Sequence, residues 1–280
     1  MHYGLCTFPT DYSIPPADLA RAAEERGFES LWVAEHSHIP ASRRTPFPGG
    51  GELPKIYYDV MDPFVALASA ASVTSRIKLA TGVCLLIQRD PIQTAKMVAS
   101  LDQLSRGRFL FGVGAGWNAE EMEHHGTPFA RRGQALREKI EAMQKLWTEK
   151  QAEYHGELVD FGPSFAWPKP VQKPWPPIHV GGGWPIGARR AVRWGDGWIP
   201  VGMPDVAAAK LPELRRMAEE AGRDASRLEV SIYSAPTDAA ALARLRNAGI
   251  ARAVFFVPSE PAGNVLPLLD RLAATAREVG

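Results

Sequence analysis

The stretch that most constrains the fold is residues 76–118, RIKLATGVCLLIQRDPIQTAKMVASLDQLSRGRFLFGVGAGWN. It contains two apolar runs typical of buried strands, residues 77–86 and 109–113, on either side of a segment with helical features. Asp90 can cap this helix, Pro91 suits its first position, and Gly107 follows its end. Because parallel neighbours need a long crossover connection, the pattern predicts two parallel strands joined by a helix.

The rest of the chain repeats this alternation of short apolar runs and amphipathic segments. We expect further strands at residues 3–8, 30–34, 177–180, 197–201, 228–233 and 253–257. We expect further helices at residues 15–27, 64–74, 129–150, 185–194, 206–221, 237–249 (with Thr237 as its cap) and 261–279. Such alternation predicts an α/β fold, a (β/α)8 TIM barrel formed by residues 1–280 as a single domain. A doubly wound open sheet is the alternative, but evenly spaced units in a chain of 280 residues favour closure.

Two segments interrupt the regular pattern. Residues 37–55 form a long Pro/Gly-rich loop after the second strand, and loops of this length inside compact domains commonly bind or cover ligands. Residues 153–161 read as a small hairpin inserted before the fifth barrel strand.

Composition excludes several classes of function. The chain has 32 basic and 31 acidic residues, and no basic cluster long enough to follow a phosphate backbone, so no nucleic-acid partner is expected. No apolar run approaches the length of a membrane span and the N-terminus lacks signal-peptide features, which favours a cytoplasmic protein without membrane partners. Cys6 and Cys84 lie in apolar runs and are expected to be buried thiols; without CxxC or HExxH motifs, no metal site is expected.

In a barrel, ligands bind where the strands end at their carboxyl side. The residues at these positions are Phe8, Glu35, His36, Thr81 to Leu86, Gly114 to Asn118, Gly181 to Gly183, and Gly202. Glycine is frequent among them, and it lets backbone N–H groups approach a bulky or phosphorylated ligand.

The candidates differ in what they can do. His36 can transfer protons or donate a hydrogen bond to a cofactor, although a structural histidine is the alternative. The glycines at 181–183 precede a helix, so they form either a phosphate site or a simple turn. Glu120 and Glu121 fall in a first helical turn, where acidic side chains favour the helix dipole, and this interpretation is preferred to a catalytic one. The run GVGAGW at 112–117 lacks the third glycine of a dinucleotide fingerprint, so a barrel loop explains it better.

The segments RDPIQTAKMVASLDQLSRGRFLFGVGAGWN, PFARRGQALREKIEAMQKLW, KPVQKPWPPIHVGGG and GDGWIPVG resemble the bacterial luciferase-like monooxygenase superfamily. Within it, the chain is most similar to the branch that uses the deazaflavin coenzyme F420. The resemblance covers nearly the whole length. It implies a (β/α)8 barrel that binds a flavin or F420 at the carboxyl ends of its strands.

The resemblance also implies roles for individual residues. A non-prolyl cis peptide is expected at Gly82-Val83, in a segment that begins at Thr81 and backs the cofactor ring. The pair Glu35-His36 maps to the cofactor site, with His36 beside the redox-active ring as proton donor or acceptor. The remaining residues expected to contact the cofactor are Gly116 and Asn118 along its length, and Gly181, Gly182 and Gly183 at its phosphate.

The implied activity is hydride transfer between F420 and a small organic substrate, with the protein orienting and tuning the cofactor. One alternative is an FMN-dependent monooxygenase that uses oxygen and receives reduced flavin from a separate reductase. Another is a non-catalytic flavin-binding protein. A homodimer is expected through helix faces at residues 64–71 and 92–104. The family's long insertion before the last strand is absent, so the loop at 37–55 is expected to enclose the substrate.

Overall fold

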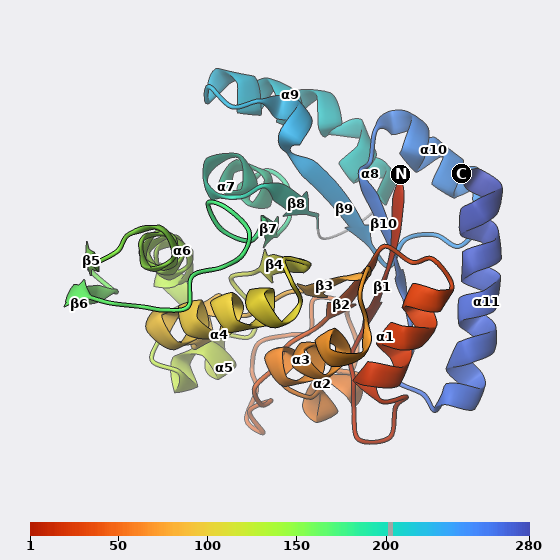
Figure 1. Ribbon diagram of the computed structural model, residues 1–280, viewed down its shortest axis with the longest axis horizontal. Helices are drawn as coiled ribbons and strands as arrows, with labels where there is room; N and C mark the ends of the chain where they lie inside the picture. The colour runs from red at the N-terminus through yellow and green to blue at the C-terminus, as the bar shows by residue number, and fades with distance from the viewer. Residues whose placement is uncertain (201–203) are drawn as a thin grey trace.

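Eight parallel strands close into a barrel in the computed structural model, which describes residues 1–200 and 204–280 (Figure 1). Going around the barrel, the strands are β1 (His2–Thr7), β2 (Ser30–Val33), β3 (Lys78–Thr81), β4 (Phe109–Val113), β7 (Ile178–Gly181), β8 (Gly197–Ile199), β9 (Glu229–Tyr233) and β10 (Arg252–Phe256). Pairing of β1 with β10 closes the ring. The barrel prediction is therefore confirmed, and the open-sheet alternative is wrong.

Helices surround the barrel and cover the outer faces of its strands (Figure 1). The longer helices are α1 (Pro16–Glu25), α3 (Pro63–Val73), α4 (Pro91–Leu104), α6 (Arg132–Thr148), α7 (Ile186–Trp194), α9 (Leu211–Glu220), α10 (Ala239–Ala248) and α11 (Ala262–Val279). The shorter helices are α2 (Ile56–Asp59), α5 (Ala119–His124) and α8 (Pro204–Ala209). Among the described residues, no helix has the length and apolarity that crossing a membrane requires.

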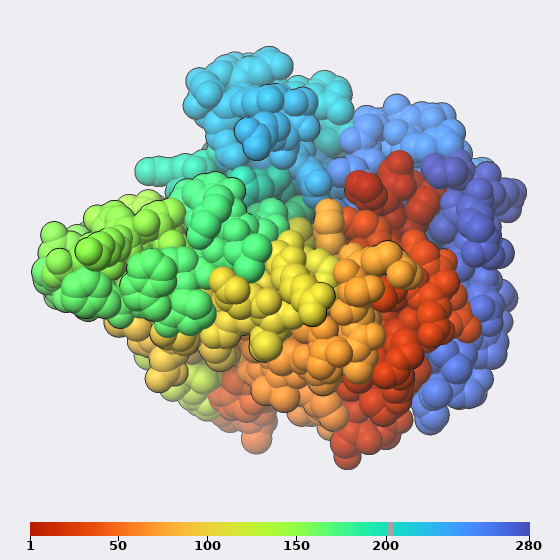
Figure 2. Space-filling model, in the orientation of Figure 1, coloured from red at the N-terminus to blue at the C-terminus, as the bar shows by residue number. Residues whose placement is uncertain are grey.

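The predicted insertion is an antiparallel hairpin outside the barrel. Its strands are β5 (Ala152–His155) and β6 (Asp160–Ser164). Figure 2 shows this part of the chain, in green, projecting from the left side of the molecule.

Helix caps show how local sequence sets the element boundaries. The Asp90 carboxylate accepts a hydrogen bond from the backbone N–H of Gln93 at 2.8 Å, which confirms it as the cap of α4. The cap of α10 is Asp238, whose carboxylate accepts from the backbone N–H of Ala241 at 2.8 Å, so the assignment to Thr237 is wrong. Thr237 and Asp238 are adjacent in the sequence, and it is the Asp238 carboxylate that accepts the capping hydrogen bond.

Several boundaries differ from the predictions. The third strand is much shorter than residues 77–86, because the chain leaves the sheet at Gly82 and enters a 3-10 helix, η1 (Leu86–Gln88). The helix predicted at 206–221 is two helices with a break at Lys210. Pro212 lies in the first turn of α9, where proline is favoured, but its missing N–H and its ring would disrupt the interior of one continuous helix. Helix α2, inside the long connection after β2, was not predicted. The end of the sixth predicted strand at 201, and Gly202, lie outside the described residues.

Side chains fill the inside of the barrel. Its separate interior cluster consists of Cys6, Trp32, Ala80, Leu110, Ile199 and Val254, with Val83 and Tyr233 packed against it. The Trp32 ring meets those of His179 and Tyr233 edge to face, each at 5.5 Å between centroids. Cys6 and Cys84 are buried free thiols, as expected. The barrel is therefore a packed core with its openings at the two ends.

A buried ion-pair cluster lies at the amino-terminal end of the strands. The Arg252 side chain has no exposed surface and donates to both carboxylate oxygens of Glu29, at 2.8 and 2.9 Å, and to Glu229 at 3.0 Å. The Ser231 hydroxyl also accepts from Arg252, at 3.0 Å. Burial acts to raise the pKa of Glu29, but the hydrogen bonds and charge of Arg252 outweigh it and lower the value to about 2.

Candidate active site

His36 lies three residues beyond the last residue of β2, Val33, at the carboxyl end of the barrel. Its Nδ1 is 2.8 Å from the Oε2 of Glu121 in α5, and the two side chains are only 6% and 1% exposed. The other carboxylate oxygen of Glu121 accepts a bond from the backbone N–H of Ser37 at 3.3 Å. Glu121 therefore fixes the orientation of the imidazole, and the described residues offer no hydrogen bond to His36 Nε2.

Glu121 is the partner that the sequence interpretation missed. Its place in the first turn of α5 is as expected, but its side chain is fully buried and points inward to His36. The signal that could have found it is topological, because β2 and β4 both flank β3 and the loops that follow them meet at the same end of the barrel.

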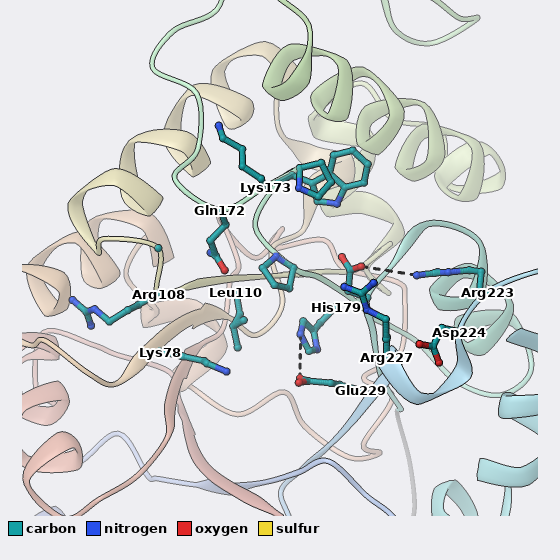
Figure 3. A pocket seen from close by; sticks show the side chains of 15 residues that line it. Lys78, Arg108, Leu110, Gln172, Lys173, His179, Arg223, Asp224, Arg227 and Glu229 are labelled. Atoms are coloured by element: carbon teal, nitrogen blue, oxygen red, sulfur yellow. Dashed lines mark ion pairs between the residues drawn. The ribbon is translucent and has the colours of Figure 1, made fainter.

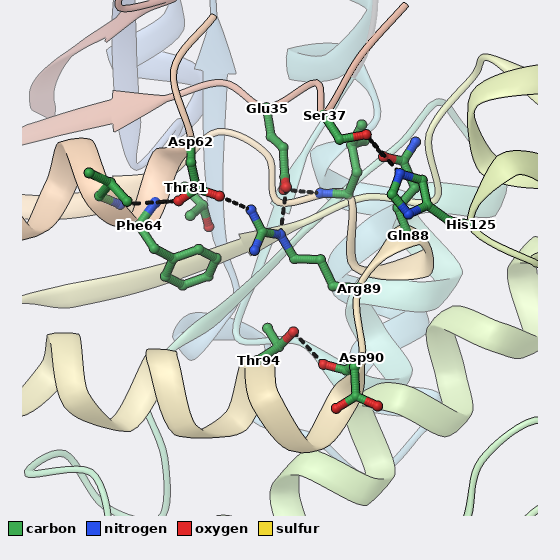
Figure 4. Close-up of polar contacts among 12 residues, drawn as sticks. Glu35, Ser37, Asp62, Phe64, Thr81, Gln88, Arg89, Asp90, Thr94 and His125 are labelled. Atoms are coloured by element: carbon green, nitrogen blue, oxygen red, sulfur yellow. Dashed lines mark hydrogen bonds and ion pairs between the residues drawn. The ribbon is translucent and has the colours of Figure 1, made fainter. Parts of the chain in front are cut away.

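Glu35 supports the backbone of the neighbouring strand. One carboxylate oxygen accepts from the backbone N–H of Leu85 at 2.7 Å and the other from Arg89 at 2.5 Å (Figure 4). Arg89 also pairs with Asp62, the cap of α3. Burial raises the pKa of Glu35, and its pairing with Arg89 opposes that effect. These contacts make Glu35 a support for the segment after β3, and its direct contact with a cofactor stays a prediction.

The segment from Thr81 to Val83 lies at the carboxyl end of β3, between the ends of β2 and β4. The Gly82-Val83 peptide is cis, as expected. The Thr81 hydroxyl donates to the Gly112 carbonyl at 2.7 Å and is fully buried. A side chain at Gly82 would collide with the Tyr233 hydroxyl, because a Cβ there would lie 2.3 Å from it. Glycine is therefore required at 82 for the end of β9 to pack against this segment.

The loop after β4 contains an unsatisfied polar group. Asn118 is 1% exposed, yet neither its amide oxygen nor its amide nitrogen has a hydrogen-bond partner among the described residues. The Tyr233 hydroxyl, at the end of β9, is likewise buried and without such a partner. Gly116 adopts a φ of +64°, a conformation that glycine favours. Buried polar groups are normally paired, so these two fit a ligand with polar edges, such as a flavin or deazaflavin ring.

The glycines after β7 form a tight turn into α7. The Gly182 carbonyl lies against the Cα of Gly187, where a Cβ would be only 2.2 Å away, and it accepts a bond from the Trp198 indole at 2.8 Å. A Cβ at Gly183 would meet no atom of the described residues within 4 Å. Gly181 approaches the side chain of Val83, so this turn and the cis peptide are neighbours. A phosphate role for Gly181, Gly182 and Gly183 stays a prediction that this geometry permits.

The loop at residues 37–55 is attached to α5 through Glu120. The Glu120 carboxylate accepts bonds from the backbone N–H groups of Arg44, at 2.5 Å, and Thr45, at 3.2 Å, and from the Thr45 hydroxyl. The Thr45 hydroxyl is the largest influence that lowers the pKa of Glu120, to about 2. Glu120 is therefore an anchor for the loop as well as a first-turn residue.

Aromatic side chains from this loop and its surroundings gather at His36. The rings of Tyr57 and Trp117 lie 5.2 and 5.9 Å from the imidazole, measured between centroids. Phe47, in the loop, contacts both rings, at 5.3 Å from Tyr57 and 5.9 Å from Trp117. The surroundings of His36 are thus largely apolar, which favours a substrate with an apolar body.

Comparison with known proteins places the chain in a protein family. The family model described as "Luciferase-like monooxygenase" matches residues 16–276. An uncharacterised protein of Mycobacterium tuberculosis (strain H37Rv) is 43% identical over 281 residues, covering 98% of each chain. An F420-dependent glucose-6-phosphate dehydrogenase of Kineococcus radiotolerans is 30% identical over 226 residues, covering 77% of this chain and 61% of that one.

Solved structures share the fold. The coenzyme F420-dependent tetrahydromethanopterin reductase of Methanopyrus kandleri aligns with a TM-score of 0.79 at 19% identity, covering 100% of this chain and 99% of that one. The oxygenating constituent of 3,6-diketocamphane monooxygenase from Pseudomonas putida, in complex with FMN, aligns with a TM-score of 0.65 at 26% identity, covering 82% and 66%.

Proposed function

The chain belongs to the luciferase-like monooxygenase family, and from this premise we propose that it transfers a hydride between coenzyme F420 and a small organic substrate. The F420-dependent dehydrogenase at 30% identity supports the choice of cofactor. The observation that carries the proposal is the buried pair of His36 and Glu121 at the carboxyl end of the barrel. It supplies an oriented proton donor or acceptor where this fold binds its ligands.

The residues that would hold the cofactor along its ring and phosphate come from three strand ends, those of β3, β4 and β7. Thr81, Gly82 and Val83 would back the ring, while Gly116 and Asn118 would lie along it. The glycines at 181–183 would face the phosphate. The unpartnered amide of Asn118 supports this assignment, because a ring with carbonyl and N–H groups would satisfy both of its polar atoms.

The protein's part in the reaction is to orient groups and move one proton. Bound F420 would accept or supply a hydride. In the oxidation of an alcohol, for example, His36 Nε2 would take the hydroxyl proton, and in the reduction of a ketone it would return that proton to the oxygen. Glu121 holds the ring through Nδ1, so Nε2 is the nitrogen available to the substrate. The aromatic side chains around His36 exclude water.

Titration with the two cofactors tests the proposal. We expect F420 to bind at least about tenfold more tightly than FMN, a difference of about 1.4 kcal/mol. The change in F420 fluorescence and in FMN absorbance on binding gives both dissociation constants. Clear binding of FMN with none of F420 would refute the deazaflavin assignment.

The second candidate is an FMN-dependent monooxygenase supplied with reduced flavin by a separate reductase. The fold it shares with the FMN-containing monooxygenase of Pseudomonas putida favours it. Oxygen consumption that requires reduced FMN and a substrate would support this function over hydride transfer. Binding of either cofactor without turnover of any substrate would point to a non-catalytic flavin-binding protein.

Assembly is also part of the proposal: residues 1–280 act as one domain, and two copies pair through α3 and α4. These neighbouring helices expose the apolar side chains of Val65, Ile92 and Leu104, which are 71%, 44% and 63% accessible. Most other apolar residues at 64–71, including Phe64 and Leu67, pack inward against the barrel. The exposed side chains therefore carry the argument for a homodimer.

Replacement of Val65 by glutamate is expected to convert the dimer to a monomer, because it places a charge in an apolar interface. Size-exclusion chromatography with light scattering measures the change in mass. Val206→Glu is the matched control, since Val206 is also exposed but lies on α8. A monomeric wild type, or a Val65→Glu variant that remains dimeric, would contradict the proposed interface.

A further inference from the structure

A cavity of about 490 Å³ lies at the amino-terminal end of the barrel, opposite the end that carries His36. The first residues of β3 and β9, Lys78 and Glu229, contribute to its wall, as do residues that immediately precede β4, β7 and β8. The segments around Lys173 and Arg227 complete it (Figure 3). Its volume falls within the range of pockets that bind small molecules.

The wall carries more positive than negative charge. Its basic residues are Lys78, Arg108, Lys173, Arg223 and Arg227, and its acidic residues are Asp196, Asp224 and Glu229. All three carboxylates already have partners within the protein. Glu229 pairs with the buried Arg252 at 3.0 Å, Asp196 accepts from the backbone N–H of Ile178 at 3.0 Å, and Asp224 accepts from Ser226.

Three of the basic side chains have no carboxylate within ion-pair distance in the described part of the chain: Arg108, Lys173 and Arg227. Arg108 donates to backbone carbonyls such as that of Ile77, at 2.6 Å, and Lys173 donates to the Pro170 carbonyl at 2.8 Å. These bonds satisfy donors but leave the charges uncompensated. The guanidinium of Arg227 has no hydrogen bond to any of the described residues, and this side chain lines the cavity (Figure 3).

His179 closes the inner end of the cavity and adds no charge to it. Its side chain is 1% exposed, and its Nε2 lies 3.8 Å from Glu229. Burial and the nearby Arg252 lower the pKa of His179 to about 4, so the ring is neutral at pH 7. The positive character of the cavity therefore comes from its arginine and lysine side chains.

Part of the wall is apolar. Leu110, Pro174, Trp175 and Pro177 line it, and the half-buried Trp175 offers a flat indole surface. We propose that this cavity binds a small organic anion whose phosphate or carboxylate is held by Arg227, and whose flat apolar part packs on Trp175. The site lies at the other end of the barrel from His36, so its test does not depend on the proposed function.

Calorimetric titration at neutral pH tests the site with three probes: inorganic phosphate, adenosine 5′-monophosphate and uncharged adenosine. We expect the monophosphate to bind most tightly, phosphate more weakly, and adenosine not measurably. Binding of the monophosphate should persist when the protein is saturated with FMN or F420, which excludes binding through the glycines at 181–183. Reversing the charge in Arg227→Glu should weaken it at least about tenfold, because a charge-assisted hydrogen bond is lost.

Controls separate this site from general electrostatic attraction. Arg227→Lys keeps the charge and should retain most of the affinity. Arg216→Glu makes the same change in net charge on α9, where Arg216 pairs with Glu220 in solvent, and should leave binding unchanged. No saturable binding of either anion, or equal weakening by Arg216→Glu and Arg227→Glu, would overturn the proposal, as would full displacement by the flavin cofactor.

Discussion

Replacing His36 with alanine is expected to lower kcat by about 10²–10⁴-fold, while the affinity for the cofactor changes little. The reason is that the imidazole is the oriented group that can exchange a proton with the substrate, whereas the backbone of residues 81–83 and 181–183 would carry most of the cofactor contacts. Steady-state kinetics with the substrate, once identified, and cofactor titration of the same preparation measure the two effects separately.

His38→Ala is the matched control for this prediction. His38 lies two residues further along the same loop, but its Nε2 pairs with His124 and not with Glu121. We expect it to keep at least a large part of the wild-type kcat. Loss of cofactor binding in His36→Ala would show a structural role for His36, and unchanged kcat would exclude it as the proton donor or acceptor.

Replacing Arg252 with alanine is expected to reduce the free energy of unfolding by about 3–5 kcal/mol. The guanidinium is completely buried and pairs with both Glu29 and Glu229, so its removal leaves two neighbouring carboxylates with only the partly exposed Lys78, 2.9 Å from Glu29, as a counter-charge. The substitution also removes the hydrogen bond that Arg252 donates to the Ser231 hydroxyl. Denaturant-induced unfolding followed by circular dichroism measures the change.

The same cluster predicts how stability depends on pH. The pKa of Glu29 falls from its ordinary 4.5 to about 2 in the folded protein, so its contribution is complete above about pH 4.5 and is lost as the pH falls towards 2. Arg252→Ala should show a smaller loss, because of the two cations that lower the pKa of Glu29 only Lys78 then remains. Arg271→Ala, a change on α11 with no ion pair in the described part of the chain, is the control and should alter stability by less than about 0.5 kcal/mol. A similar effect of both substitutions would contradict the prediction.

The barrel could be predicted because its signals are local. The residues of β4 are all buried, and such a short apolar run between turn residues indicates a buried parallel strand without further information. The Asp90 cap is likewise written in adjacent residues. Predicted helix boundaries were wrong where a second local signal lay inside an amphipathic segment. Pro212 is such a signal, because proline favours the first turn of a new helix.

The contacts that define the candidate site are not local. Glu121 reaches His36 across 85 residues of chain, and the pattern of a first-turn glutamate contains nothing that specifies its partner. Tyr233 reads as the end of an ordinary strand, and only the packed barrel brings its hydroxyl against Gly82. Which side chains meet across a barrel depends on the order and register of the strands around it. No pattern of neighbouring residues in one sequence specifies that register.

The two neighbouring glutamates of α5 also bear on how a protein of this kind can diversify. Glu121 holds the histidine, and Glu120 holds the covering loop by the backbone and hydroxyl of Thr45. Residues 46–55 lie beyond that attachment, so insertions and substitutions there can alter what the loop accepts without moving His36. Under the proposed function, substrate preference and proton transfer can therefore evolve as separate traits, although the loop and His36 are both held by the same six-residue helix.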